Sequence, residues 1–160
     1  MKKIGIISDT HGFINPEVYK IFAGVDQILH AGDIGSEDII TSLEAIAPVQ
    51  AVYGNIDTCP IVTRYPEILT IKIEHINIVM IHQFRNLKSP EIAQARQKLN
   101  GRVDVLIYGH SHQAKLERID DTWLFNPGAA GKKRFSLRPA VGLLKIQQSG
   151  EFIPEIIYLE

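Results

Sequence analysis

The stretch LIYGHSHQAK, from Leu106 to Lys115, joins an apolar segment to a glycine and two histidines that are spaced by one residue. Its apolar first half favours a buried strand, which Gly109 ends. Neutral imidazole is the commonest metal ligand in proteins, but a His-x-His pair also occurs in ordinary loops. The meaning of His110 and His112 therefore depends on which residues stand at the ends of the other strands of the chain.

Five apolar segments rich in β-branched residues predict the main strands. They are 3–9 (KIGIISD), 26–33 (DQILHAGD), 49–55 (VQAVYGN), 76–82 (INIVMIH) and 103–110 (VDVLIYGH). Helical patterns separate several of them, which is typical of α/β architecture. The expected helix starts are Asn15 as N-cap before Pro16, Ser36 as N-cap of 37–47, and Ser89 before Pro90, in a helix that reaches Asn100 and stops at Gly101.

Further strand-like segments decide between one sheet and two. Residues 70–82 contain two such segments, which meet at a predicted turn over 75–77. The tail contains four more, at 114–120, 122–126, 140–146 and 152–160. We therefore expect parallel pairing early in the chain and hairpins later. So many strands with about three helices fit poorly in one doubly wound sheet, and two sheets packed face to face with helices outside accommodate them better.

Composition predicts a single domain over residues 1–160. The chain is 45% hydrophobic, enough for one buried core, and no composition shift suggests a linker. Lys and Arg total 17 against 18 Asp and Glu, so no basic field favours bulk binding of nucleic acid or an anionic membrane.

Cysteine usage and hydropathy bear on the compartment. Cys59 is the only cysteine and cannot form an internal disulfide. No run approaches the roughly 18 apolar residues of a membrane span. The apolar start ends at Asp9 and is shorter than the roughly 7 to 15 residues of a signal-peptide core. These features predict a cytoplasmic protein, and they leave a homo-oligomer open.

Residues of metal-ligand type stand at the ends of all five main strands. They are Asp9 and His11, Asp33, Asn55, His82, and His110 with His112. Because the carboxyl ends of parallel strands share one edge of an α/β sheet, we expect these side chains to converge.

Seven ligands are too many for one ion. Carboxylate, imidazole and amide donors without thiolate suit two ions of Mn, Fe, Ni, Zn or Co better than a structural zinc. Asp33 is the expected bridge, since a carboxylate has two oxygens and this residue lies in the middle of the ligand order.

The local sequence around these ligands carries further expectations. Glycine precedes Asp33, Asn55 and His110, where it would allow close backbone approach or a conformation that other residues avoid. The Asp-x-His and His-x-His pairs are expected to place both side chains on one side of an extended segment. Each motif alone also fits a turn or a buried histidine. Because residues of metal-ligand type occur at all five strand ends, the set as a whole favours a metal site over unrelated turns and buried histidines.

The motifs, in order, resemble those of the calcineurin-like metallophosphoesterase superfamily. They are DTH (9–11), GD (32–33), GN-x-D (54–57), His82 and GHSH (109–112). The short length, together with NPGA (126–129), is similar to the small bacterial and archaeal YfcE-like phosphodiesterase branch. This resemblance implies a four-layer αββα sandwich of two mixed β-sheets flanked by helices, with a dinuclear metal site at the strand ends.

The resemblance also assigns roles to individual residues. It implies that Asp9, His11 and His112 bind one metal, that Asn55, His82 and His110 bind the other, and that Asp33 binds both. Asp33, Asn55 and His110 are accordingly the expected catalytic residues.

Two positions depart from the pattern of the superfamily. Many phosphomonoesterases and protein phosphatases of the superfamily have a proton-donating histidine directly after the asparagine, where this chain has Ile56. Isoleucine cannot transfer a proton, so the departure favours diesters with good leaving groups over monoesters. After His82 the branch usually has glycine, whereas this chain has Gln83, which is expected to narrow or charge the mouth of the site.

The expected function is hydrolysis of small phosphate diesters by a hydroxide that bridges two metal ions roughly 3.5 to 4 Å apart. Mn or Ni is the expected cofactor, with Fe, Zn or Co as alternatives. Arg85 and Arg134 are candidates for substrate binding. Asp57 and His30 are candidates for orienting the ligands or their loops, although His30 also fits a hydrogen-bonded core residue. The alternatives are a non-catalytic metal-binding scaffold resembling the retromer subunit of the same fold, and a metal-storage or regulatory domain.

Overall fold

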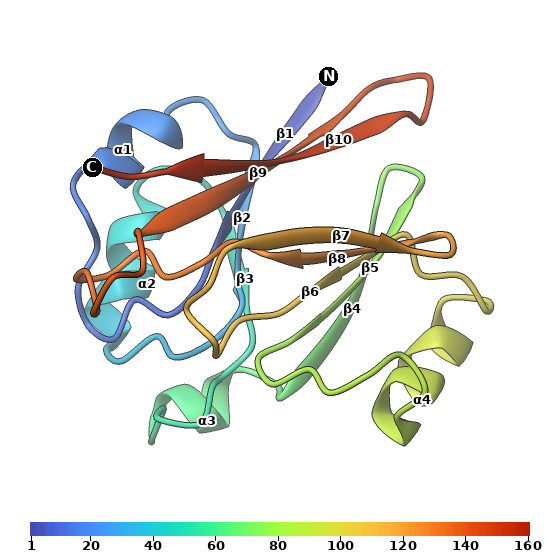
Figure 1. Cartoon of the computed structure of the whole chain (residues 1–160), viewed down its shortest axis with the longest axis horizontal. Coiled ribbons are helices and arrows are strands. Elements are labelled where there is room, and N and C mark those ends of the chain that lie inside the picture. Colours follow the sequence, from blue (N-terminus) through green and yellow to red (C-terminus); the bar gives the residue numbers. More distant parts are fainter.

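The structure is a computed structural model that describes all residues from 1 to 160, and its strands form two sheets (Figure 1). Sheet A contains β1 (Lys2–Ile7), β2 (Gln27–His30), β3 (Val49–Ala51), β9 (Ala140–Ile146) and β10 (Phe152–Tyr158). Sheet B contains β4 (Ile68–Ile73), β5 (Ile76–Ile81), β6 (Val105–Ile107), β7 (Lys115–Ile119) and β8 (Thr122–Asn126). The strand orders are β10-β9-β1-β2-β3 and β4-β5-β6-β8-β7. Both sheets combine parallel and antiparallel pairs and are therefore mixed.

An apolar core between the two sheets results from alternation along the strands. On β1, Ile4 is fully buried in this core, whereas Ile7 belongs to a cluster on the outer face of sheet A. On β5, Ile78 points into the same core and Val79 points to the outer face of sheet B. Because strand side chains alternate with a period of two, each apolar strand can bury both of its faces. Each such side chain contributes roughly 1.5 to 3 kcal/mol relative to exposure.

Helices cover both outer faces. They are α1 (Glu17–Ile21), α2 (Glu37–Glu44), α3 (Ile61–Arg64) and α4 (Pro90–Lys98). Val18 and Leu43 are buried in the cluster on sheet A, and Ile92 in the cluster on sheet B. Figure 1 shows α1 and α2 on one side of the sheets and α4 on the other. The four-layer αββα sandwich is thus confirmed.

The helix termini follow local chemistry with small shifts. The side chain of Ser36 caps α2 as predicted, accepting a hydrogen bond from a backbone N–H within its first turn. Ser89 is the N-cap of α4, but its side chain makes no capping bond. Helix α1 begins at Glu17, one residue later than predicted. The side chain of Asn15 nevertheless accepts a hydrogen bond from the N–H of Glu17. Two helices end before the predicted residues, α2 at Glu44 rather than Ala47 and α4 at Lys98 rather than Asn100.

Three details of the chain path differ from the sequence-based expectation. The turn between β4 and β5 lies at Glu74 and His75 rather than over 75–77, because Ile76 already pairs with β4. Strand β8 in the tail is parallel to β6, so the tail is not built of hairpins alone. The single-turn helix α3 was not predicted, since four residues are too few for a periodic pattern.

No helix is both long and apolar enough to cross a membrane.

Candidate metal centre

The loops after β1, β2, β5 and β6 are joined by backbone hydrogen bonds at one edge of the sandwich. The N–H of Asp9 donates to Gly32 O at 3.0 Å, and the N–H of His11 donates to Asp33 O at 3.0 Å. On sheet B, the loop after β6 donates to His82 O at 3.0 Å. The backbone therefore holds ligand-type side chains from separate strands close together.

The first group of potential ligands contains Asp9, His11, Asp33 and His112, whose donor atoms all lie within 4.8 Å of one another. The Nε2 atoms of His11 and His112 are 3.2 Å apart. His112 Nε2 is 3.3 Å from Asp9 Oδ1, and His11 Nε2 is 3.4 Å from Asp33 Oδ2. Four donor atoms thus face a common point.

The second group contains Asp33, His82 and His110, and so shares Asp33 with the first. His82 Nε2 lies 3.2 Å from Asp33 Oδ2. Asn55 joins this group, because its Oδ1 lies 3.0 Å from His110 Nδ1. All seven residues that the sequence singled out as ligands are therefore brought together, with Asp33 common to both groups.

Two buried polar atoms have no hydrogen-bond partner, Asp9 Oδ1 and His82 Nε2. His82 Nδ1 lies 2.7 Å from the carbonyl oxygen of Ala31, so Nδ1 donates and Nε2 presents a lone pair. This lone pair faces Asp9 Oδ1 at 3.7 Å. A buried acceptor without a partner costs about 1 to 3 kcal/mol, and a cation between the two acceptors would remove that cost.

The spacing of the donor atoms also fits a metal ion. Two ligands that each lie about 2.1 Å from an ion in tetrahedral or octahedral geometry are about 3.0 to 3.4 Å apart. The distances of 3.2, 3.3 and 3.4 Å in the first group agree with this range. The residues therefore suit a divalent metal by chemistry, by spacing and by their unpaired atoms.

Electrostatics at the site favour positive charge. Burial alone would raise the pKa of Asp9 and of Asp33, but the adjacent histidines, and at Asp33 also the Ile56 N–H, outweigh it, so both pKa values lie below the ordinary value. Burial alone would lower the pKa of His82, but the adjacent carboxylates of Asp33 and Asp9 raise it. Two ionised carboxylates in a buried site stabilise a cation between them, whether proton or metal.

The two short histidine motifs are not extended, and this part of the sequence-based expectation is wrong. Asp9 and His11 have φ angles of 53° and 48°, and His110 and His112 have angles of 74° and 61°. In this left-handed conformation the chain turns sharply at each ligand. Non-glycine residues adopt it rarely and at some cost in free energy. Here the turns direct both side chains of each pair inward.

Glycines beside the ligands are required by crowding. A Cβ on Gly32 would lie 2.8 Å from His82 Cβ, and the φ of Gly32 is +99°. A Cβ on Gly54 would collide with the carboxylate of Asp33. Both positions therefore exclude a side chain, as expected from the close approach of backbone to ligands.

Asp57 ties the loop after β2 to the loop after β3. Its carboxylate accepts hydrogen bonds from the N–H groups of Ile34 at 3.1 Å, Gly35 at 2.9 Å and Gly54 at 2.8 Å. These donors flank Asp33 and Asn55 in the chain. The geometry thus gives Asp57 the means to fix the positions of two potential ligands.

His30 is fully buried behind the ligands. Its Nδ1 accepts a hydrogen bond from Gly32 N–H at 3.1 Å, which leaves the proton on Nε2 to bond Thr10 Oγ1 at 3.0 Å. Thr10 in turn donates to Ile34 O at 2.9 Å. Burial lowers the pKa of His30 to about 4, so the ring is neutral. His30 is a hydrogen-bonded core residue that also supports the DTH loop.

Three supporting residues escaped the sequence-based prediction. Ser8 Oγ donates to Asp9 Oδ2 at 2.7 Å, and Thr10 links the DTH loop to His30. The Asn126 side chain donates to Gly109 O at 3.2 Å and so holds the loop before His110. Their position inside the SDTH and NPGA stretches was the only available signal, because serine, threonine and asparagine are common in loops.

Ile56 and Gln83 lie beside the ligand-type residues. Ile56 is 42% exposed and its N–H donates to Asp33 Oδ1 at 3.0 Å. Gln83 Nε2 lies 3.4 Å from His110 Nε2.

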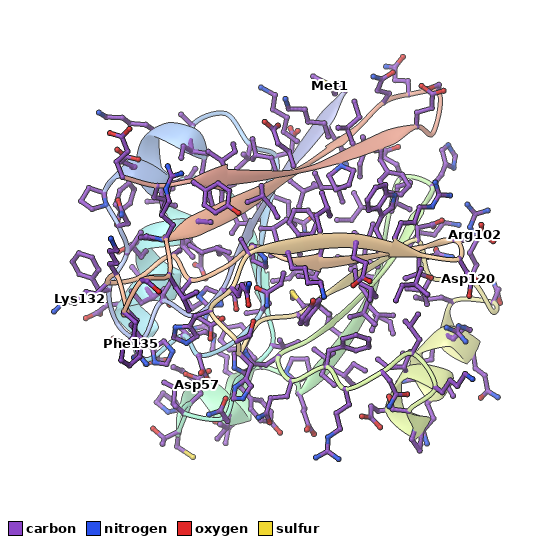
Figure 2. The ribbon with its side chains drawn as sticks, viewed as in Figure 1. Met1, Asp57, Arg102, Asp120, Lys132 and Phe135 are labelled. Atoms are coloured by element: carbon purple, nitrogen blue, oxygen red, sulfur yellow. The ribbon has the colours of Figure 1, made fainter.

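Arg134, one of the two arginines predicted to bind substrate, is exposed in a loop that also contains Lys132 and Phe135. Figure 2 shows Lys132 and Phe135 on the same side of the molecule as Asp57. Arg85 lies elsewhere, on a groove beside α4. Neither arginine forms a hydrogen bond or an ion pair with the seven ligand-type residues.

Two face-to-face mixed sheets, with carboxylates and imidazoles gathered at one edge, define a metal-binding α/β sandwich protein. The family model described as the calcineurin-like phosphoesterase superfamily domain matches residues 1–149. The chain belongs to this superfamily, as its motifs indicated.

Individual relatives agree with this assignment. The chain is 36% identical over 148 residues to a probable metallophosphoesterase of Methanothermobacter thermautotrophicus, covering 89% of this chain and 85% of the relative. It is 28% identical over 163 residues to a protein of Methanocaldococcus jannaschii named phosphodiesterase, covering 91% and 94%. Vps29 from Chaetomium thermophilum has the same fold, with a TM-score of 0.75 at 20% identity over 99% of this chain and 97% of that one.

Proposed function

We propose that the protein is a metal-dependent phosphodiesterase that hydrolyses small phosphate diesters at a centre for two divalent ions. The observation that carries the proposal is the presence of Asp33 in both groups of potential ligands. Asp33 Oδ2 lies 3.4 Å from His11 Nε2 and 3.2 Å from His82 Nε2, so the same carboxylate faces both groups and the remaining ligand-type residues divide around it.

The residues that would hold the ions follow from this division. Asp9, His11 and His112 would join Asp33 at one ion, and the second ion would take the ligands Asn55, His82, His110 and Asp33. Oxygen and imidazole donors suit Mn or Ni, with Fe, Zn or Co as alternatives. When bound, two such ions lower the pKa of water and offset charge on the phosphoryl oxygens.

The surrounding residues of this chain hold that arrangement in place. The N–H of Ile56 donates to Asp33 Oδ1, which fixes the orientation of the shared carboxylate. The carbonyl oxygen of Ala31 holds the His82 ring so that Nε2 faces the site. Ligands that are oriented before the ions arrive lose less conformational entropy on binding.

The preference for diesters rests on Ile56. Its side chain is partly exposed beside Asp33 and has no proton to give to a leaving group. A positioned acid typically contributes about 10²- to 10⁴-fold. A diester with a stabilised leaving group depends little on such an acid, whereas an alkyl monoester depends on it strongly. The likeness to a relative named phosphodiesterase supports this choice.

A cavity beside the metal centre is consistent in size with a small substrate. A cavity of about 200 Å³ adjoins His112 and is lined on its other side by Ser136, Arg138 and Tyr158. Arg138 forms no ion pair and lies over the Tyr158 ring at 4.9 Å, so its charge is available to an anionic substrate.

The test supplies Mn, Ni, Mg or Zn to metal-stripped protein and measures hydrolysis of an aryl diester and of an alkyl monoester. We expect Mn- or Ni-dependent turnover of the diester well above that of the monoester. In Ile56→His, monoester turnover should rise selectively, by up to about 10²-fold. Preference of the natural protein for alkyl monoesters would contradict the proposal, since another residue would then act as the acid.

The second candidate is a non-catalytic metal-binding scaffold, and the observation in its favour is the likeness of the fold to Vps29. Fold alone does not distinguish an enzyme from a scaffold. Two bound ions per chain without turnover of any ester in the panel would favour the scaffold.

A further inference from the structure

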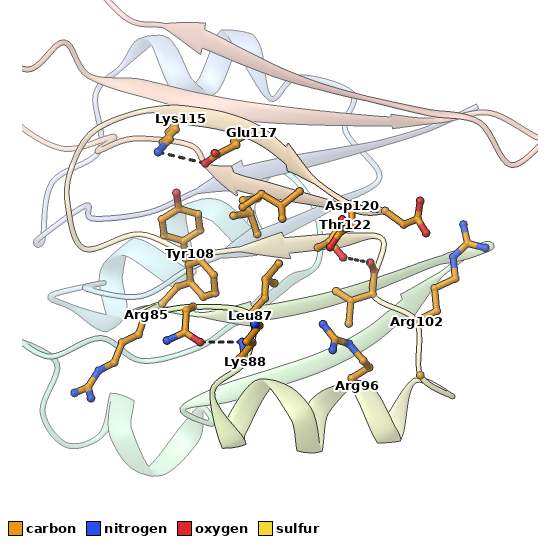
Figure 3. A pocket seen from close by; sticks show the side chains of 17 residues that line it. Arg85, Leu87, Lys88, Arg96, Arg102, Tyr108, Lys115, Glu117, Asp120 and Thr122 are labelled. Atoms are coloured by element: carbon orange, nitrogen blue, oxygen red, sulfur yellow. Dashed lines mark hydrogen bonds and ion pairs between the residues drawn. The ribbon is translucent and has the colours of Figure 1, made fainter.

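A groove of about 1050 Å³ crosses the outer face of sheet B, apart from the metal centre (Figure 3). Helix α4 covers the part of this face formed by β4 and β5, and the groove lies over β7 and β8, beside the two ends of β6. One wall is formed by the loop 84–88 and α4, and the other by β7 and the turn after it. The volume is at the upper end of the range of small-molecule sites, about 300 to 1,000 Å³.

The groove has an apolar and aromatic floor at one end. Leu124 of β8 is 4% exposed. The rings of Phe84 and Tyr108 lie 5.2 Å apart, tilted by 52°. Burial raises the pKa of Tyr108 above its ordinary value, so the phenol remains neutral. Aromatic side chains of this kind offer a surface on which a planar ring can pack.

Cations without partners line the wall beside this floor. Arg85, Lys88 and Arg96 line the groove, and none forms an ion pair with a carboxylate. Figure 3 shows Arg96 directed from α4 toward the groove, with Lys88 nearby and Arg85 at the rim. The other cations of the lining have partners, since Lys115 pairs with Glu117 and Arg102 pairs with Asp104. Two unpaired cations on this wall, Lys88 and Arg96, favour an anion that carries more than one charge.

Acidic residues restrict the length of that anion. Asp120 and Asp121 line the groove at the turn after β7, and Figure 3 shows Asp120 at the end opposite Arg85. A strand of nucleic acid laid along the groove would place phosphates against these carboxylates. A small ligand with its charge at the cationic end avoids them.

We propose that this groove is a metal-independent binding site for nucleoside phosphates. The base would pack against the Phe84 and Tyr108 end of the floor, and the phosphate would bind Lys88 and Arg96, with Arg85 at the rim. The site is independent of the hydrolytic activity proposed above.

The groove is nevertheless connected to the metal centre through the chain. Phe84 lies two residues after His82, and Tyr108 lies two residues before His110. A ligand that orders the floor therefore contacts the same segments that present two potential metal ligands. Bound nucleotide should in this way affect the second group of ligands without touching it.

The experiment maps binding of AMP to the full-length protein by ¹H–¹⁵N NMR, in zinc-loaded and in chelator-treated samples. We expect amide shifts at 84–88, 96, 108 and 120–124 in both samples. Adenosine alone and inorganic phosphate alone should each bind at least about tenfold more weakly, because each lacks half of the contacts. Shifts confined to the loops of the metal centre, or phosphate that binds as tightly as AMP, would overturn the proposal.

Matched variants test the charges. Arg96→Glu should weaken AMP binding by about tenfold or more, since it removes a charge-assisted contact. Lys98→Glu makes the same charge change in the same helix turn, but Lys98 does not line the groove, so AMP affinity should be unchanged. Lys88→Glu in the loop serves as a second variant should Arg96→Glu disturb α4. Equal losses in the Lys88 and Lys98 variants would overturn the proposal.

Discussion

Asp33 is the residue on which both groups of potential ligands depend. Asp33→Ala should lower metal-dependent activity by more than about 100-fold, beyond the 10- to 100-fold that loss of a supporting contact typically costs. It should also cost more than His11→Ala or His112→Ala, because two neighbouring cations would lose the negative charge that offsets their repulsion. Steady-state kinetics at saturating metal would measure this.

Asp121→Ala is the control for the Asp33 variant, since Asp121 is exposed and belongs to neither group of potential ligands. Its activity should equal that of the natural protein. Equal losses across all seven ligand variants would show that Asp33 is no more than a terminal ligand.

His30 should make stability depend on pH. Its folded pKa is about 4 because the ring is fully buried, against an ordinary value of 6.5. Between these values the unfolded chain binds a proton that the folded chain excludes. The contribution of His30 to the free energy of unfolding is therefore fully present above about pH 6.5. As the pH falls toward 4, the free energy of unfolding decreases by on the order of 3 kcal/mol.

The measurement is urea unfolding of metal-free protein from pH 7.5 to 4.5. His30→Gln, which does not titrate, should have a flatter pH profile than the natural protein by this amount. His75→Gln changes an exposed histidine in a turn and should leave the profile unaltered. Identical profiles for His30→Gln and the natural protein would contradict the neutral buried ring.

At the scale of elements, Asp57 connects the loops after β2 and β3. Asp57→Ala would leave three backbone N–H groups without their acceptor. The loops that present Asp33 and Asn55 would then be less fixed. We expect metal affinity to fall by about 10- to 100-fold, as for other residues that orient ligands.

Metal titration in competition with a chelator would measure this loss. Asp57→Asn keeps one acceptor oxygen and should lose less affinity than Asp57→Ala. Unchanged affinity in Asp57→Ala would mean that the strands alone position the ligands.

At the scale of the whole molecule, metal binding should stabilise the fold, because the ligands come from strands of both sheets. At a free metal concentration about 100 times Kd, the gain is about 2.7 kcal/mol per ion. For a chain of this length, that corresponds to a rise in Tm of about 5 to 11 °C. Calorimetry with and without chelator would measure it.

The rise in Tm should be reduced in Asp9→Asn, which removes a charged potential ligand, and retained in Lys98→Glu, which lies away from the centre. An equal rise in both variants would place the stabilising ions elsewhere on the protein.

The sequence by itself determined the class of the fold and the chemistry of the centre. Alternation in strands such as β1 and β5 is a local property of the chain, because successive side chains point to opposite faces. Seven ligand-type residues at five strand ends are likewise visible in order, and topology brings such ends to one edge.

Only the tertiary structure decided how the ligand loops turn and which groups support them. The left-handed conformations at Asp9 and His110, the three hydrogen bonds to Asp57 and the parallel pairing of β8 with β6 depend on segments far apart in the sequence. The conformational preference of a single residue type is weak compared with such long-range contacts, so the sequence alone does not predict these features. The groove over sheet B has the same origin, because Arg96 and Tyr108 share it only once α4 has packed against the sheet.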